Sequence, residues 1–386
     1  MPALSKVTRL HLWIPEIWGF KGGIQVYSAF LIDALQSLYP EIKYDIFLKH
    51  DTKSDLKLFY SPNTHFYCTG AWPRAIRTSI FASKLFGQGI SQRPDLIIST
   101  HLNFTIVAYW LKRIFGIPYW TIVHGIEAWN VQDSALQKAV LGADRILSVS
   151  NYTRNRLLET QNIAPEKISI LPCTFEANRF QIGSKPVYLL ERYHLNSAQP
   201  IILTVCRLSS SEQYKGYDQI IAALPEICQA IPNVHYVLVG KGDDLSRIEQ
   251  IVARLQLQDY VTLTGFVPDE ELCDHYNLCD VFAMPSKGEG FGIVYLEALA
   301  CGKPILGGNQ DAAVDALCYG ELGALVNPDD IEAIAQTLIE LLQGTYSNSL
   351  LYQPQALRQK AIATFGFSSF KQTLGDYLEN YLEKCL

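Results

Sequence analysis

The sequence predicts an α/β fold made of two consecutive Rossmann-like domains. The chain has 386 residues, which is more than one ordinary domain holds. Short apolar runs alternate with longer amphipathic stretches, as they do in βα units around a parallel sheet. The alternation lapses at 181–199, a stretch with glycine and proline that is typical of an interdomain connection. We therefore expect a first domain over 1–180 and a second over 181–367.

The first series of apolar runs predicts six strands with helices between most of them. These strands lie at 7–15, 43–48, 95–99, 119–124, 145–149 and 168–171. The most hydrophobic long stretch, 104–123, contains Lys112, Arg113, Gly116 and Pro118, which would be costly inside a lipid bilayer. It is therefore expected to form a helix, a turn and a buried strand.

The second series predicts six more strands and a cleft. These strands lie at 201–206, 234–239, 261–264, 281–284, 304–306 and 324–326. Open parallel sheets bind ligands at the carboxyl ends of their strands, so two such sheets are expected to face each other across a binding cleft. A last helix, 368–386, follows the second series and is expected to cross back to the first domain.

Composition excludes some classes of partner. Hydrophobic residues make up 48% of the chain and charged residues 18%, which is enough apolar material for two cores. The net charge of −6 argues against a nucleic-acid binder. Residues 1–180 hold 19 Lys and Arg against 13 Asp and Glu, a formal +6, and the remainder carries −12. The positive half would suit an anionic acceptor or membrane surface, and chance surface variation is the alternative.

The cysteines and the N-terminal sequence indicate a cytoplasmic location. Nine cysteines are scattered without zinc-type or Cys-x-x-Cys spacing, as in a reducing compartment. The first residues lack the apolar core and cleavage site of a secretory signal. We expect a cytoplasmic protein that could lie peripherally at the inner face of the membrane.

The segment 284–304 carries the strongest motif of the chain. An apolar strand ends at Pro285, glycines follow at 288, 290 and 292, and a helix is expected to start at Phe291 or Gly292. The N–H groups of Gly292, Ile293 and Val294 would then point out of the first turn, which favours an anion such as a diphosphate.

Two carboxylates accompany this turn. Glu289 lies in the loop and Glu297 about one and a half turns into the helix, so both can project toward one wall of the cleft. Ionised carboxylates accept hydrogen bonds from sugar hydroxyls. The alternative is that both side chains are simply solvated.

With these residues in place, the segment EGFGIVYLEALACGKP resembles the Glu-x7-Glu element of retaining glycosyltransferases of family 4. The resemblance implies the GT-B arrangement of two Rossmann-like domains. It also implies that Gly290, Phe291, Gly292, Ile293 and Val294 bind the donor, that Glu289 holds a hydroxyl of the donor sugar and that Glu297 accepts from the ribose.

Further landmarks occur in the order that the family requires. Arg207 and Lys215 resemble the cations that clamp the donor diphosphate, one a planar fork and the other a mobile ammonium. Gly240, Phe266 and Val267 resemble the residues that surround the nucleotide base. Alone, two surface cations or a Gly-x-Gly would carry no such meaning.

In the first domain, Gly22 and Gly23 follow the first strand and His124 follows the strand 119–124. The resemblance implies that the glycines let the donor approach and that His124 orients the sugar or the acceptor. A plain tight turn and a structural histidine are the alternatives.

The chain also departs from the family pattern in two places. Pro172-Cys-Thr-Phe-Glu176 stands where many relatives carry Pro-Asn-Gly before an acidic residue. Gly307-Gly308-Asn309-Gln310-Asp311 replaces the commoner Gly-Gly-x-Pro-Glu. The first departure affects the domain junction and the second affects part of the sugar pocket.

Taken together, these motifs predict a metal-independent, retaining transfer of a hexosyl unit from a UDP- or GDP-sugar to a glycan, lipid-linked or small-molecule acceptor. His124, Arg207, Lys215 and Glu289 are the expected catalytic residues. No cofactor is expected, because positive charge comes from the protein and no Asp-x-Asp is present.

Three other functions are alternatives to glycosyl transfer. A dehydrogenase would need Gly-x-Gly-x-x-Gly after a first strand, and the sequence lacks it. A nucleotide-sugar epimerase on the same fold and a non-catalytic sugar-binding protein stay open, although the joint presence of the expected catalytic residues argues against the second.

The stretch 72–89 is a candidate surface for binding the acceptor. It carries Arg74, Arg77 and Lys84 among large apolar residues. Such a pattern suits a surface for a lipid-linked acceptor or an anionic membrane, and an ordinary amphipathic helix packed on the sheet is the alternative.

Overall fold

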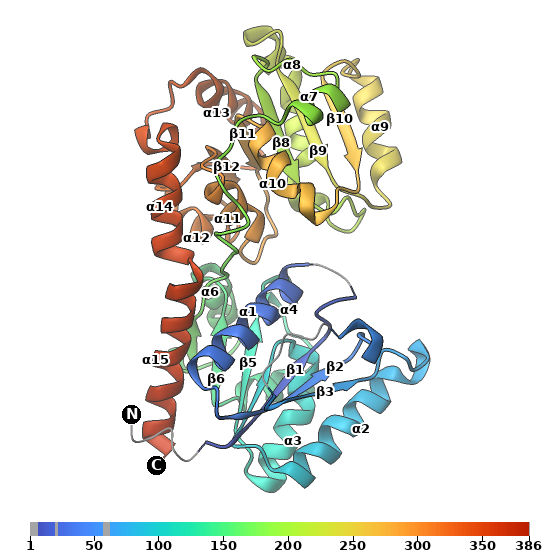
Figure 1. Cartoon of the computed structure of the whole chain (residues 1–386), viewed down its shortest axis with the longest axis vertical. Coiled ribbons are helices and arrows are strands. Elements are labelled where there is room, and N and C mark those ends of the chain that lie inside the picture. Colours follow the sequence, from blue (N-terminus) through green and yellow to red (C-terminus); the bar gives the residue numbers. More distant parts are fainter. Residues whose placement is uncertain (1–6, 20–21, 57–61, 386) are drawn as a thin grey trace. The chain divides into compact units, whose positions relative to one another are not determined.

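A computed structural model of the chain describes residues 7–19, 22–56 and 62–385. It divides into two compact units, Met1–Thr174 with Phe367–Leu386, and Phe175–Gly366 (Figure 1). Each unit is built around one parallel sheet covered by helices, so the predicted α/β class with two sheets is confirmed.

The first unit contains a sheet of seven parallel strands in the order β3-β2-β1-β4-β5-β6-β7. Its strands are β1 (Arg9–Ile14), β2 (Lys43–Leu48), β3 (Thr64–Cys68), β4 (Leu96–Ser99), β5 (Tyr119–Val123), β6 (Arg145–Ser148) and β7 (Ile168–Ile170). Its helices are α1 (Gly23–Leu38), α2 (Arg74–Gln92), α3 (Thr105–Phe115), α4 (Ile126–Trp129), α5 (Ser134–Leu141), α6 (Asn151–Thr160) and α15 (Phe367–Cys385).

The order in which strands are added to the first sheet changes direction at β1. α1 leads from β1 to β2, whereas α2 returns the chain from β3 to β4, so the strand order reverses between β1 and β4. Since such crossovers are right-handed, α1 lies on one face and α2 on the other. α3 packs against both α2 and α5, and α2 and α3 are seen side by side in Figure 1.

The C-terminal helix α15 packs on the first unit, as the sequence predicted. It lies against α1, where the ring of Phe370 meets that of Tyr27 with centroids 5.5 Å apart. The hydroxyl of Tyr377 donates to the carbonyl of Ile170 at 2.8 Å. Burial of the apolar face of α15 therefore holds the last helix of the chain against α1 of the first unit.

The second unit contains six parallel strands in the order β10-β9-β8-β11-β12-β13. These are β8 (Ile201–Val205), β9 (His235–Val239), β10 (Val261–Gly265), β11 (Val281–Met284), β12 (Ile305–Gly308) and β13 (Ala324–Val326). The helices are α7 (Val187–Arg192), α8 (Tyr217–Ala230), α9 (Leu245–Arg254), α10 (Asp269–Leu278), α11 (Ile293–Ala300), α12 (Ala313–Ala316), α13 (Ile331–Gln343) and α14 (Pro354–Phe365).

The chain passes between the units earlier than the sequence suggested. Residues 175–180 belong with the second unit because Phe175 pairs with Gly366. The guanidinium of Arg358 also donates to the carbonyls of Ala177 and Phe180. The crossings therefore lie at 174/175 and 366/367, whereas 180/181 and 367/368 were expected.

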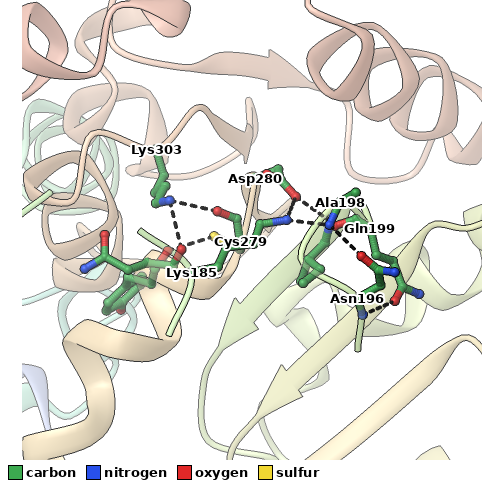
Figure 2. Close-up of polar contacts among 10 residues, drawn as sticks. Lys185, Asn196, Ala198, Gln199, Cys279, Asp280 and Lys303 are labelled. Atoms are coloured by element: carbon green, nitrogen blue, oxygen red, sulfur yellow. Dashed lines mark hydrogen bonds and ion pairs between the residues drawn. The ribbon is translucent and has the colours of Figure 1, made fainter. Parts of the chain in front are cut away.

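The stretch 181–199, which we expected to connect the domains, is instead fixed to the second unit. Figure 2 shows Lys185 donating to Asp280 and to the carbonyl of Gln199, both at 2.7 Å. The same Asp280 carboxylate accepts from the N–H of Ile201 at 2.8 Å. These bonds hold the start of β8 beside the start of β11, at the end of the sheet opposite the site described below.

Among the strands of the described residues, the sequence analysis missed β3. Its five residues, THFYC, are mostly half-buried and include two polar side chains, because β3 lies at the edge of the sheet. β3 has no long apolar run, and so the pattern used for the other strands does not detect it.

Candidate functional site

The second unit gathers the predicted cations at the carboxyl ends of its central strands β8 and β11. Arg207 follows β8, and Lys215 ends a short 3-10 helix, Gln213–Lys215. Lys215 forms an ion pair with Glu289, which follows β11. This ion pair joins two loops whose residues lie 74 positions apart in the sequence.

The pair is shielded from solvent. The side chains of Lys215 and Glu289 are 16% and 12% exposed. Burial by itself lowers the pKa of Lys215, but the charge and hydrogen bond of Glu289, together with Tyr214 and Cys206, outweigh that effect and the pKa rises. Lys215 is therefore a permanent cation at any physiological pH.

A second carboxylate, Glu212, lies between the two cations. Its Oε1 is 2.9 Å from Nη2 of Arg207, and its Oε2 is 4.0 Å from Nζ of Lys215. Arg207 is 54% exposed, so its outer edge stays accessible to a ligand. Sequence reasoning did not identify Glu212, because nothing in its spacing shows that it reaches both cations.

The glycine turn before α11 has the conformation that the motif requires. Gly292 has φ +88°, a left-handed conformation that L side chains rarely adopt. A Cβ placed there would lie 2.5 Å from the ring of Tyr295, whose hydroxyl donates to the carbonyl of Met284 at 2.6 Å. α11 begins at Ile293, one or two residues after the expected start. The N–H of Tyr295 donates to the carbonyl of Gly292 at 3.0 Å, and the N–H groups of Ile293 and Val294 have no acceptor within the helix.

Asp311 holds the loop that carries Glu289. Its carboxylate accepts from the N–H of Glu289 at 2.7 Å, from the hydroxyl of Ser286 at 2.7 Å and from the N–H of Ala313 at 2.9 Å. Burial raises its pKa to about 6 although these donors favour the charged form. Asp311 belongs to the segment that departs from the family pattern, which was the one available signal of its importance.

Because of this carboxylate, we expect ligand affinity at the site to fall as the pH drops through about 6, where Asp311 gains a proton and loses acceptor capacity. Folding responds with the opposite sign. A raised pKa means that the native state binds the proton more tightly than the unfolded state does. The free energy of unfolding therefore falls as the pH rises from about 3.9 to the folded pKa, and this group causes no further change at higher pH.

The test compares Asp311→Asn with the wild type by nucleotide titration between pH 5 and 8. The terminal phosphate of the nucleotide titrates in the same range, so the ratio of the two affinities is the useful quantity. That ratio should shrink below pH 6, and the variant should lose about 1–3 kcal/mol of stability at neutral pH through unsatisfied N–H groups. A constant ratio would remove Asp311 from the site.

Glu297 has a different partner from Glu289. It projects from α11, and its Oε2 accepts from the hydroxyl of Tyr276 on α10 at 2.7 Å. Tyr276 is fully buried, and burial with the nearby Glu297 charge raises its pKa. Tyr276 thus fixes one carboxylate oxygen of Glu297, a contact that sequence spacing could not predict.

The residues expected near the base follow β9 and β10. The N–H of Gly240 donates to the carbonyl of Gly265 at 3.1 Å, and a Cβ at Gly240 would overlap the carbonyl of Cys206. Phe266 is 65% exposed and lies 4.5 Å from Nζ of Lys241, while Val267 beside it is partly buried. An exposed ring at this edge of the sheet offers a stacking surface.

The remaining predicted residues lie in the first unit. Gly22 is the N-cap of α1 in an extended conformation. The His124 Nε2 lies 3.0 Å from the carbonyl of Thr100, and the ring meets that of Tyr27 edge-on. Burial lowers the pKa of His124 to about 4, so the ring is neutral at physiological pH. The second unit thus holds the predicted cations and carboxylates, and the first holds His124 and Gly22-Gly23.

In the described ranges, no group of three or more His, Cys, Asp or Glu side chains could hold a metal ion. None of the helices in those ranges combines the length and the apolar character needed to span a membrane.

Two family models match the chain. Residues 21–179 match glycosyltransferase family 4, and residues 190–361 match glycosyl transferases group 1. A curated relative is the GDP-mannose-dependent alpha-(1-6)-phosphatidylinositol monomannoside mannosyltransferase of Mycolicibacterium smegmatis, 33% identical over 231 residues. That match spans 57% of this chain and 59% of the relative.

Solved structures share the fold. Sucrose-phosphate synthase from Thermosynechococcus elongatus has a TM-score of 0.80 at 21% identity and covers 98% of this chain and 100% of its own. Anabaena HepE in complex with UDP-glucose has a TM-score of 0.78 at 20% identity, with 96% and 99% covered.

Proposed function

The chain belongs to the family 4 glycosyltransferases, and from that premise we propose that it transfers a hexosyl unit from a UDP- or GDP-sugar to an acceptor hydroxyl with retention. One observation carries the proposal. Arg207 and Lys215 lie together beside the glycine turn that opens α11, and this concentrates positive charge where a diphosphate would leave.

The reaction requires little more than positioning and charge compensation. The bond from the anomeric carbon to the phosphate oxygen breaks, and the acceptor oxygen bonds to that carbon on the same face. The acceptor proton passes to the departing diphosphate. Arg207 and Lys215 stabilise the charge on the diphosphate, and the N–H groups of Gly292, Ile293 and Val294 bind its oxygens.

The other residues would position the donor. Glu297, oriented by Tyr276, would accept from the ribose hydroxyls, and Glu289 would bind a hydroxyl of the sugar. Gly240, Phe266 and Val267 would surround the base. A diphosphate would compete with Glu212 for Arg207, so this carboxylate is expected to release the guanidinium on binding.

In the first unit, Gly22 and Gly23 would admit the donor, and neutral His124 would orient the sugar or the acceptor. The acceptor is proposed to be a glycan, a lipid-linked sugar or a small molecule. The name of the Mycolicibacterium smegmatis relative combines GDP-mannose with phosphatidylinositol monomannoside, and that of the Thermosynechococcus elongatus structure contains sucrose phosphate, which fits this range.

The proposal is tested with labelled UDP- and GDP-hexoses and a panel of glycosides and lipid extracts. We expect label in an acceptor product whose anomeric coupling matches that of the donor, at a rate that EDTA leaves unchanged. Release of an altered nucleotide sugar without an acceptor would indicate an epimerase, and inhibition by EDTA would contradict the metal-independent reaction.

Peripheral contact with an anionic membrane is also proposed, through the N-terminal end of α2. Phe81 and Leu85 of this helix are buried in the core, as in an ordinary amphipathic helix. Trp72 and Ile76 are instead 49% and 46% exposed, beside Arg74. An aromatic ring and cations together suit a bilayer surface.

Exchanging both Trp72 and Ile76 for serine should therefore lower co-sedimentation with anionic vesicles several-fold, because the apolar anchor is removed. The matched control is Trp110→Ser with Ile114→Ser, which removes two exposed apolar side chains from α3. Equal loss in both variants, or none in either, would refute this surface.

A further inference from the structure

Cationic and N–H donor groups collect at the carboxyl edge of the first sheet, and of these only Arg74 was placed in the membrane surface proposed above. Lys49 and His50 follow β2, His101 follows β4, and Arg74 and Arg77 lie in the first turn of α2. Their contact is direct in one place, where Nη1 of Arg77 lies 3.3 Å from Nδ1 of His50.

The two histidines of this cluster both present donors. An arginine can only donate, so Nδ1 of His50 accepts and the ring proton is on Nε2. His101 is arranged in the same way, since its Nδ1 accepts from the N–H of Asn103 at 3.2 Å. Lys49 and Arg74 add an ammonium and a guanidinium, both of which can only donate hydrogen bonds.

The positive charges are close enough to oppose one another. Burial and then Arg77 lower the pKa of Lys49, and burial followed by Lys49 and Arg77 lowers that of His50. Within the described part of the chain, Lys49, Arg74 and Arg77 form no ion pair with a carboxylate. Arg77 is held by backbone instead, through the carbonyls of Gly70 and Trp72.

The neighbouring carboxylates are already engaged. Asp51 accepts from the N–H groups of Ile17, Trp18 and Gly19 at 2.6 to 3.1 Å. Glu127 accepts from the N–H of His124 at 2.5 Å. Asp51 raises the pKa of His50 and Glu127 raises that of His101, so both carboxylates offset part of the positive charge. The three cations Lys49, Arg74 and Arg77 outnumber these two carboxylates, and the cluster keeps an excess of positive charge.

The position in the fold points the same way. The strand order of the first sheet reverses between β1 and β4, and β2 and β4 flank β1 on either side. Open α/β sheets bind ligands outside the carboxyl ends of strands at such a reversal. Lys49 and His101 follow the two flanking strands at that end.

We propose that Lys49, His50, Arg74, Arg77 and His101 form a binding site for a phosphate group of the acceptor. The inference rests on the proposed function and narrows its acceptor to a phosphate-bearing one. The phosphate can belong to a soluble sugar phosphate or to the headgroup of a lipid such as phosphatidylinositol, since both present the same oxygens to these donors.

Two titrations of the full chain separate those sources. The first adds hexose 6-phosphate, with the unphosphorylated hexose as reference, in the presence of UDP and GDP so that the proposed donor site is filled. The second measures co-sedimentation with phosphatidylinositol vesicles against phosphatidylcholine vesicles. The variant is Lys49→Gln with Arg74→Gln, and it leaves the backbone contacts of Arg77 intact.

The matched control is Lys43→Gln with Arg113→Gln. It removes the same charge from exposed positions at the start of β2 and near the end of α3. We expect the test variant to bind the phosphate ligand about tenfold or more weakly while the control is unchanged. Loss confined to the soluble ligand assigns a sugar phosphate, and loss confined to vesicles assigns a headgroup.

No phosphate binding in either assay, or equal binding by both variants, would overturn the site. Nucleotide affinity is measured in parallel and should be the same in all three proteins. If the wild type bound phosphate here but no nucleotide, the proposed function would fail and the phosphate site would stand.

Discussion

Replacing Arg207 by alanine is expected to lower kcat/KM about 10²- to 10³-fold, the usual cost of losing one electrostatic stabiliser of a transition state. The guanidinium is half-exposed and pairs with Glu212, so its removal should disturb folding little. Steady-state kinetics with the active nucleotide sugar would measure the loss. Arg254→Ala, an exposed cation of α9, should leave the rate unchanged, and near-normal turnover of the Arg207 variant would remove this residue from the mechanism.

The Gly292→Ala substitution should abolish detectable donor binding and lower the free energy of unfolding by about 1–3 kcal/mol. The new Cβ would need φ +88° and would meet the Tyr295 ring 2.5 Å away. That ring cannot retreat easily, because it is buried and its hydroxyl is bonded to Met284. The turn that opens α11 would have to move instead. Thermal melts and nucleotide titration measure the two effects.

Gly344→Ala separates backbone strain from the effect on the site. Gly344 ends α13 with φ +75°, but a Cβ there meets nothing within 4 Å. This variant should be somewhat less stable and should bind nucleotide normally. If it lost nucleotide binding as fully as Gly292→Ala does, the result would indicate a general loss of stability and the turn before α11 would have no special role.

Most of the fold could be predicted from the sequence because parallel strands buried on both faces give apolar runs that polar helices interrupt. β5 and β8 are fully or almost fully buried, and their positions agree with those runs. β3 was missed because its half-buried sequence, THFYC, contains no long apolar run. The crossing at 174/175 was missed because it depends on Arg358, which lies far along the chain from the carbonyls that it binds.

The glycines of the candidate site could be predicted from the sequence, whereas the side chains that contact its charged residues could not. The left-handed turn at Gly292 follows from the residue type and its place before a helix. The links from Glu212 to Arg207, from Tyr276 to Glu297 and from Asp311 to the Glu289 loop are tertiary contacts. Spacing along one chain cannot show which side chains of two loops will meet.

Calorimetric titration of the full chain with UDP, GDP and the corresponding nucleosides tests the central claim most directly. If Arg207, Lys215 and the first turn of α11 bind a pyrophosphate, one diphosphate should bind about a hundredfold or more tightly than its nucleoside. Arg207→Ala should remove most of that difference. Equal affinity for nucleoside and diphosphate, or a difference that persists in the variant, would contradict the account.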